Sequence, residues 1–274
     1  ALSSAASDVY KRQAIDRAMF FLQTRCGIRS IQEINYTLML VLIASVFMKD
    51  EWFGDKNVHG ILEAWYWSSI FGGEYDKNQN TVVIIHLQSM IKTLKKEQGN
   101  EWIQGIKELI FEAQNFSDRE FVLMGKVEED RYPKAILKQF VCQYLLASTY
   151  KDMFSNKTIS VFSDEAKSLE AHHIIPLGSV AKVGEMTSKL RNDPKNICNS
   201  PLNFVYITQE ANKEILDAPL DVYIKKITDE AKAELFLSAY TNPNSEEDEI
   251  RNLLENRYQF LRGNIRSKVE KLLG

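Results

Sequence analysis

Apolar residues recur at intervals of three and four along the first half of the chain, the spacing of one helix face. They form such a stripe from Ala14 to Leu22, and Gly27 predicts the end of this helix. Further helices are expected at residues 34–47, 58–70, 81–94, 102–111 and 134–149. Because residues 82–85 are all β-branched, a buried strand is the alternative for 81–94.

The second half of the chain adds two short strand patterns. After a polar connector, in which residues 158–162 could form a short strand, a strand is expected to end at Pro176. The run FVYI at 204–207 predicts a second strand, and Thr208 fits the N-cap of the helix that follows it. A helix is expected at 220–227, a turn at 242–245 and an amphipathic helix at 246–273. The last helix is expected to pack on the body of the protein, with a dimeric coil as the alternative.

These patterns predict a mainly α fold, in which a helical bundle is followed by a small ββα unit and a long C-terminal helix. The predicted domains are residues 14–155, which are helical, and residues 156–274, which hold the ββα unit. Residues 1–13 are expected to be a disordered or non-native leader, because the string SDVYKRQ at 7–13 resembles translated adapter sequence. On that interpretation the chain is a truncated copy of a longer protein.

Composition excludes several classes of protein. The chain has 274 residues, of which 45% are hydrophobic and 26% charged, as in ordinary globular proteins. Its cysteines, Cys26, Cys142 and Cys198, are far apart, so neither a zinc finger nor a disulfide framework is expected, and the chain suits a reducing cytoplasm. No apolar run is long enough to cross a membrane. A net charge of −3 argues against a protein that coats nucleic acid, although a local basic patch can still hold one phosphate.

The adjacent residues His172 and His173 are the main candidates for chemistry. Neighbours on a strand point to opposite faces, so one ring can reach a metal while the other reaches a water molecule or is held by the backbone. Asn212 follows near the start of the helix after the second strand. Two strands and a helix that carry these side chains are a compact arrangement for holding one divalent cation.

The run HHIIP at 172–176, followed by Asn203 and Asn212, resembles the HNH, or ββα-metal, nuclease motif. Many members of that family have histidine where this chain has Asn212. The nine-residue step from Asn203 to Asn212 is similar to that of the HNH domain of RNA-guided DNA nucleases, which also ends in asparagine.

This resemblance implies a role for each motif residue. His173 would be the general base that takes a proton from the attacking water, and Asn203 would orient it through the loop backbone. His172 and Asn212 would bind the metal. Such a shell leaves positions open for water and phosphate, and it suits Mg²⁺ or Mn²⁺. The activity implied is the hydrolysis of DNA phosphodiester bonds.

Basic residues surround the motif in the sequence. Arg191 and Lys195 lie in the loop between the two strands, together with Lys182 and Lys189, and Lys213 follows Asn212. These side chains are expected to contact substrate phosphates. Ordinary solvated lysines in a loop are the alternative.

The aromatic helix LEAWYW at 62–67, with Phe71 and Tyr75, resembles the helical middle section of GmrSD-type modification-dependent restriction proteins. Those proteins begin with a ParB-like NTP-binding domain, for which this chain shows no motif, and end with an HNH-type domain. The resemblance implies the cleavage part of a phage-defence restriction system that acts on modified DNA. Because one HNH site cuts one strand, a homodimer is expected from function. The alternative is a catalytically inactive module of the HNH fold that binds nucleic acid or protein.

Overall fold

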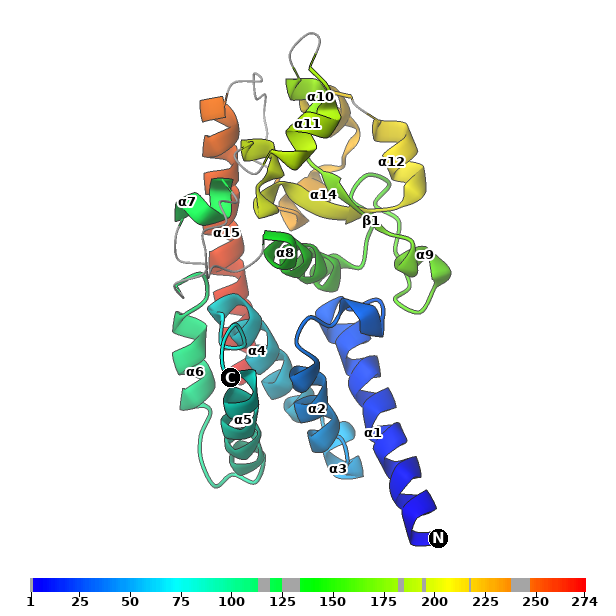
Figure 1. Ribbon diagram of the computed structural model, residues 1–274, viewed down its shortest axis with the longest axis vertical. Coiled ribbons are helices and arrows are strands. Elements are labelled where there is room, and N and C mark those ends of the chain that lie inside the picture. Colours follow the sequence, from blue (N-terminus) through cyan, green and yellow to red (C-terminus); the bar gives the residue numbers. More distant parts are fainter. Residues whose placement is uncertain are drawn as a thin grey trace. The chain divides into compact units, whose positions relative to one another are not determined.

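The computed structural model describes the chain except for residues 1, 113–118, 125–133, 182–184, 194–195, 217 and 238–246 (Figure 1). It divides into two compact units. The first unit comprises residues 1–114 and 264–274, and the second comprises residues 115–263. As predicted, the fold is mainly α, with a small two-stranded sheet.

The first unit is helical in its described residues. Its elements are α1 (Leu2–Cys26), α2 (Thr37–Val46), α3 (Asp50–Phe53), α4 (Lys56–Gly72), α5 (Gln79–Leu94), α6 (Glu101–Glu108) and the end of α15 (Glu247–Leu273). The helices expected from periodicity are confirmed, and α5 is a helix despite its β-branched run. The stop at Gly27 is also confirmed, because its φ of 63° is the left-handed conformation that ends helices. Helix α1 begins at Leu2, so residues 2–13, expected to be a disordered leader, are helical.

Helix α4 supplies the aromatic core of the first unit. Trp65 and Trp67 are fully buried, and Tyr66 is nearly so. The indole N–H of Trp65 donates to Nδ1 of His86, which α5 buries beside it, at 3.1 Å. His86 therefore serves this core, as is usual for a buried histidine with a fixed partner.

The second unit contains the sheet and a further set of helices. Its elements are α7 (Arg119–Met124), α8 (Lys134–Thr149), α9 (Asp164–Lys167), β1 (Glu170–His173), α10 (Leu177–Val180), α11 (Thr187–Asn192), β2 (Phe204–Ile207), α12 (Gln209–Ile215), α13 (Leu220–Tyr223), α14 (Asp229–Glu234) and the first part of α15. In place of the strand considered at 158–162, an isolated bridge joins Lys151 and Thr158. The turn predicted at 242–245 lies outside the described residues.

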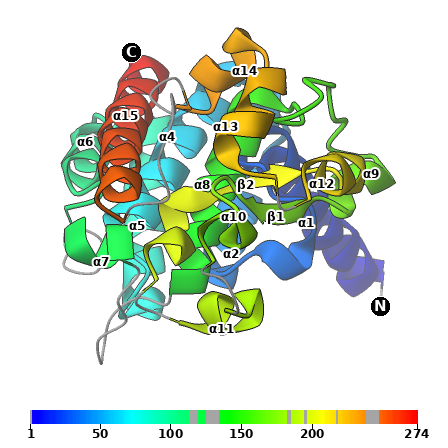
Figure 2. The ribbon, with the colours of Figure 1, turned by 90° about the horizontal axis from the view of Figure 1, so that it is seen from above.

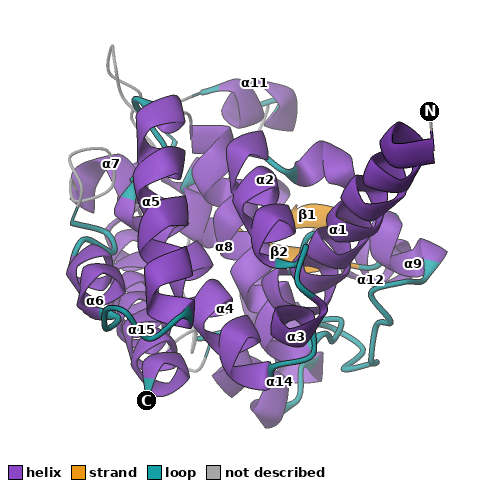
Figure 3. Cartoon of the chain, turned by 90° about the horizontal axis from the view of Figure 1, so that it is seen from below, coloured by secondary structure: helices purple, strands orange, loops and turns teal. Residues whose placement is uncertain are grey.

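The two strands pair antiparallel and lead into α12 (Figures 2 and 3). In this register His172 faces Val205 and His173 faces Phe204. Thr208 caps α12 as predicted, because its hydroxyl accepts from the backbone N–H of Ala211 at 3.2 Å. The predicted order of strand, strand and helix is therefore present.

Helix α8 packs against β2 and contributes to the same core. Cys142 and Leu146 from α8 meet Phe204 and Tyr206 from β2 in this cluster. The domain boundary predicted at residue 155 therefore falls inside the second unit, because α8 covers the strand that carries the motif.

Helix α15 buries the apolar face expected from its periodicity. Leu254, Leu261, Ile265 and Val269 are fully buried, so packing on the body of the protein is confirmed. The spacing of three and four residues also places Phe260 on this face, but its side chain is 60% exposed. Among the described residues, the helices are all too short or too polar to cross a membrane.

Candidate functional site

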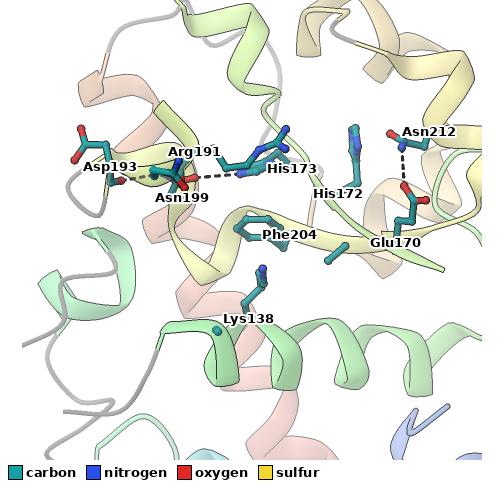
Figure 4. Close-up of a pocket in the computed structure, with 12 residues that line it drawn as sticks. Lys138, Glu170, His172, His173, Arg191, Asp193, Asn199, Phe204 and Asn212 are labelled. Atoms are coloured by element: carbon teal, nitrogen blue, oxygen red, sulfur yellow. Dashed lines mark hydrogen bonds between the residues drawn. The ribbon is translucent and has the colours of Figure 1, made fainter. Parts of the chain in front are cut away.

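A pocket of about 690 Å³ opens beside the two strands of the second unit (Figure 4). Side chains of β1, β2, α8, α11, α12 and the segment before β2 contribute to it. The residues that line it are Ala135, Lys138, Glu170, Ala171, His172, His173, Arg191, Asn192, Asp193, Asn199, Phe204 and Asn212. His172, His173 and Asn212 thus meet at one pocket, although Asn212 is 39 positions beyond His173 in the sequence.

Both histidines line this pocket, although neighbours on a strand normally point to opposite faces. His173 is the last residue of β1, and a bend follows at Ile174 and Ile175. His173 therefore lies at the end of the strand, where a pocket can receive side chains from both faces.

His173 is held by two neighbours. Its Nε2 lies 3.2 Å from the side-chain oxygen of Asn199, and its ring centroid lies 4.2 Å from that of Phe204. Burial lowers the pKa of His173 from 6.5 to about 4, while the hydrogen bond with Asn199 acts in the opposite direction. The imidazole is therefore neutral at pH 7, which is the form that can accept a proton.

Asn203 is fully buried and holds the backbone on both sides of the strand pair. Its amide oxygen accepts from the N–H of Ile175 at 2.9 Å. Its amide nitrogen donates to the carbonyl oxygens of Ile175 at 3.1 Å and Cys198 at 2.7 Å. The side chain thus fixes the loop that follows His173 without lining the pocket itself.

Two further side chains bind the backbone at this place. The hydroxyl of Tyr223 in α13 donates to the carbonyl oxygen of Ile174. Arg257 in α15 is buried and donates to the carbonyl oxygen of Leu202. Helices far along the chain therefore support the loop after β1 and the approach to β2.

At the other end of the pocket, the amide of Asn212 has a defined orientation. Its nitrogen donates to the carboxylate of Glu170 at 2.8 Å, and its oxygen is turned toward His172 (Figure 4). An imidazole and an amide oxygen together can hold a divalent cation, with the Glu170 carboxylate close by. Within the described residues, no three His, Cys, Asp or Glu side chains cluster as a metal site, so such a cation would keep several water ligands.

Some of the basic residues expected to contact the substrate lie at the pocket and others do not. Arg191 lines the pocket, whereas Lys213 is exposed on α12 and is not part of the lining. Lys195 lies outside the described residues. Lys138 of α8 also lines the pocket, with its ammonium group 4.7 Å from the ring centroid of Phe204.

Sequence reasoning missed Asn199 and Lys138. Asn199 stands in a short 3-10 helix, Ile197–Asn199, where no periodic pattern distinguishes an inward side chain from an outward one. Lys138 lies in a helix 34 residues before His172, and only the packing of α8 on β2 brings it to the pocket.

Comparison with known proteins adds no relative. No protein-family model matches the chain. Neither the curated proteins nor the solved structures contain a significant match.

Proposed function

We propose that this protein is a metal-dependent endonuclease of the HNH type that hydrolyses phosphodiester bonds of DNA. The observation that carries this proposal is the meeting of His172, His173 and Asn212 at one pocket, on a ββα frame that Asn203 fastens. These are the residues of the motif, and each occupies a place that suits the role the resemblance implies.

The proposed reaction begins with a water molecule in the pocket. His173 takes a proton from this water, whose oxygen attacks the phosphorus while the bond from phosphorus to the leaving oxygen breaks, and the leaving oxygen takes a proton from solvent. Packing against Phe204 and the bond to Asn199 keep the ring in one orientation. Asn203 acts through the backbone, because it fixes Ile175 two positions after the base.

His172 and Asn212 would hold the cation, Mg²⁺ or Mn²⁺. When bound, the cation stabilises negative charge on the phosphate and on the leaving oxygen. Glu170 keeps the Asn212 oxygen turned to the pocket by accepting from its nitrogen. Arg191 and Lys138 add positive charge at the His173 end, where they can contact the phosphates beside the scissile bond.

The wider role follows from the sequence resemblance. We propose that the chain supplies the cleavage part of a GmrSD-like phage-defence system, which acts on modified DNA together with a ParB-like NTPase domain or subunit. One pocket hydrolyses one strand, so a double-strand break requires two copies or two visits.

The proposed function predicts nicking of supercoiled plasmid. Incubation of the whole chain with Mg²⁺ or Mn²⁺ should convert supercoiled DNA to open circles, and EDTA should stop the conversion. Plasmid, modified phage DNA and a structured RNA are compared side by side, because a held phosphate does not distinguish the sugars. A folded protein that binds Mn²⁺ but cleaves none of these substrates would favour the non-catalytic module.

Metal binding offers a prediction that does not depend on cleavage. Calorimetric titration with Mn²⁺ should detect one site in the wild type and none in His172→Ala or Asn212→Ala. Glu170→Ala should weaken binding by about tenfold to a hundredfold, the usual effect of losing a partner that orients a ligand. Glu170→Gln should bind more tightly than Glu170→Ala, because the glutamine oxygen can still accept from Asn212.

The control for Glu170 is Glu214→Gln, which removes a carboxylate from the exposed surface of α12. It should bind Mn²⁺ as the wild type does. Equal affinity of wild type and Glu170→Ala would show that Glu170 does not orient the amide.

A further inference from the structure

The amide of Asn199 is fixed in one orientation by three acceptors. Its nitrogen donates to the carbonyl oxygens of Leu190 at 2.7 Å, Asp193 at 2.9 Å and Arg191 at 3.3 Å. The residue is only 5% exposed. Turning the amide over would place its oxygen against three carbonyl oxygens, none of which can donate. The oxygen of Asn199 must therefore be the atom that faces His173.

This orientation determines which nitrogen of His173 carries the proton. The Asn199 oxygen lies 3.2 Å from Nε2 of His173 and can only accept a hydrogen bond. Nε2 must then be the donor. In a neutral imidazole one nitrogen carries hydrogen and the other carries a lone pair, so the lone pair is on Nδ1.

We propose that Asn199 is a positioning residue that holds neutral His173 as the Nε2–H tautomer and leaves Nδ1 to accept the proton of the attacking water. This inference rests on the proposed function for the second half of the statement. The first half concerns only the imidazole and can be tested without any cleavage. The base, His173, belongs to the motif, whereas the residue proposed to position it, Asn199, does not.

The arrangement links the base to the segment that carries Arg191. The three carbonyls bound by Asn199 belong to the end of α11 and the residues just after it. The carbonyl oxygens of Leu190 and Asp193 also accept backbone N–H groups at 3.2 Å, from Asp193 and Asn196, so the amide is a second donor to each. The same amide thus binds the end of α11 with its nitrogen and orients His173 with its oxygen. A structural role and a positioning role can be separated only by variants that keep one half of the amide.

Two substitutions make this separation. Asn199→Ala removes both halves of the amide. Asn199→Asp loses the donor to the three carbonyls but keeps an oxygen that accepts from Nε2–H. If Asn199 only satisfied the end of α11, aspartate would be the more harmful of the two, since its charge would face carbonyl oxygens. If Asn199 holds the tautomer, aspartate preserves what alanine loses.

The experiment is nitrogen-15 NMR of the whole chain labelled with [¹⁵N]histidine, at pH 8, where imidazoles are neutral. The protein has four histidines, so the signals of His173 are assigned by their disappearance in His173→Gln. The wild type should show a protonated Nε2 and an unprotonated Nδ1. Asn199→Asp should keep this pattern, and Asn199→Ala should show averaged shifts of two exchanging tautomers.

A wild-type His173 signal with hydrogen on Nδ1 would overturn the proposal, and this outcome does not depend on the folding of any Asn199 variant. Unchanged His173 shifts in a folded Asn199→Ala protein would overturn it as well. In the nicking assay, Asn199→Ala should lose about tenfold or more, and Asn199→Asp should retain more activity than alanine. The expected spectra without any nicking by the wild type would leave the tautomer assignment intact and refute the proposed nuclease function.

Discussion

Replacing His173 with alanine is expected to reduce plasmid nicking by about 10²–10⁴-fold, the usual contribution of a general base. The imidazole lines the pocket, and burial keeps it neutral at pH 7. Alanine leaves the pocket without a group that can take the proton of the attacking water. The initial rate of conversion of supercoiled to open-circular plasmid measures the effect, with Mg²⁺ and Mn²⁺ each tested.

The matched control is His59→Gln. His59 lies in the first unit, where its Nε2 bonds to the carbonyl oxygen of Phe53 at 2.8 Å, and it contributes nothing to the pocket. This variant should nick at close to the wild-type rate. His173→Ala should also bind Mn²⁺ normally, because the proposed metal ligands remain. A His173→Ala protein that still nicks at the wild-type rate would remove His173 from the mechanism.

The parts of this architecture that the sequence predicts correctly are those set by local sequence signals. The bounds of α8 and β2 and the N-cap at Thr208 agree with their predictions. Periodicity, β-branched runs and capping residues act within one or two turns of chain, so they are visible without the fold. Asn203 and Asn212 are predicted by a different signal, their spacing within a motif, which is also visible without the fold.

Contacts between distant segments could not be predicted. Arg257 lies in a helix whose pattern indicates an ordinary polar face, yet its side chain is buried and bonded to Leu202, 55 positions away. Asn199 and Lys138 reach the pocket only because α8 and the segment before β2 pack around it. Such contacts depend on tertiary packing. Neither hydrophobic periodicity nor secondary-structure propensity describes that packing.

Alanine is expected to destabilise the protein at Asn203 but to leave its stability almost unchanged at Asn212. Asn203→Ala removes three buried hydrogen bonds and leaves the Ile175 N–H and two carbonyl oxygens without a side-chain partner. A buried polar group left unsatisfied costs about 1–3 kcal/mol, so the free energy of unfolding should fall by about 2–5 kcal/mol. Asn212→Ala removes one exposed bond to Glu170, and its cost should stay within about 0.5 kcal/mol.

Hydrogen exchange followed by mass spectrometry measures this difference where it arises. All four tryptophans, at positions 52, 65, 67 and 102, lie in the first unit, so their fluorescence reports on that unit alone. Peptides that cover residues 170–177 and 198–207 should exchange faster in Asn203→Ala and at the wild-type rate in Asn212→Ala. Asn212→Ala should instead lose Mn²⁺ binding while remaining folded. Wild-type protection of both peptides in Asn203→Ala would show that the backbone after His173 does not depend on this amide. That result would refute the proposed orienting role of Asn203.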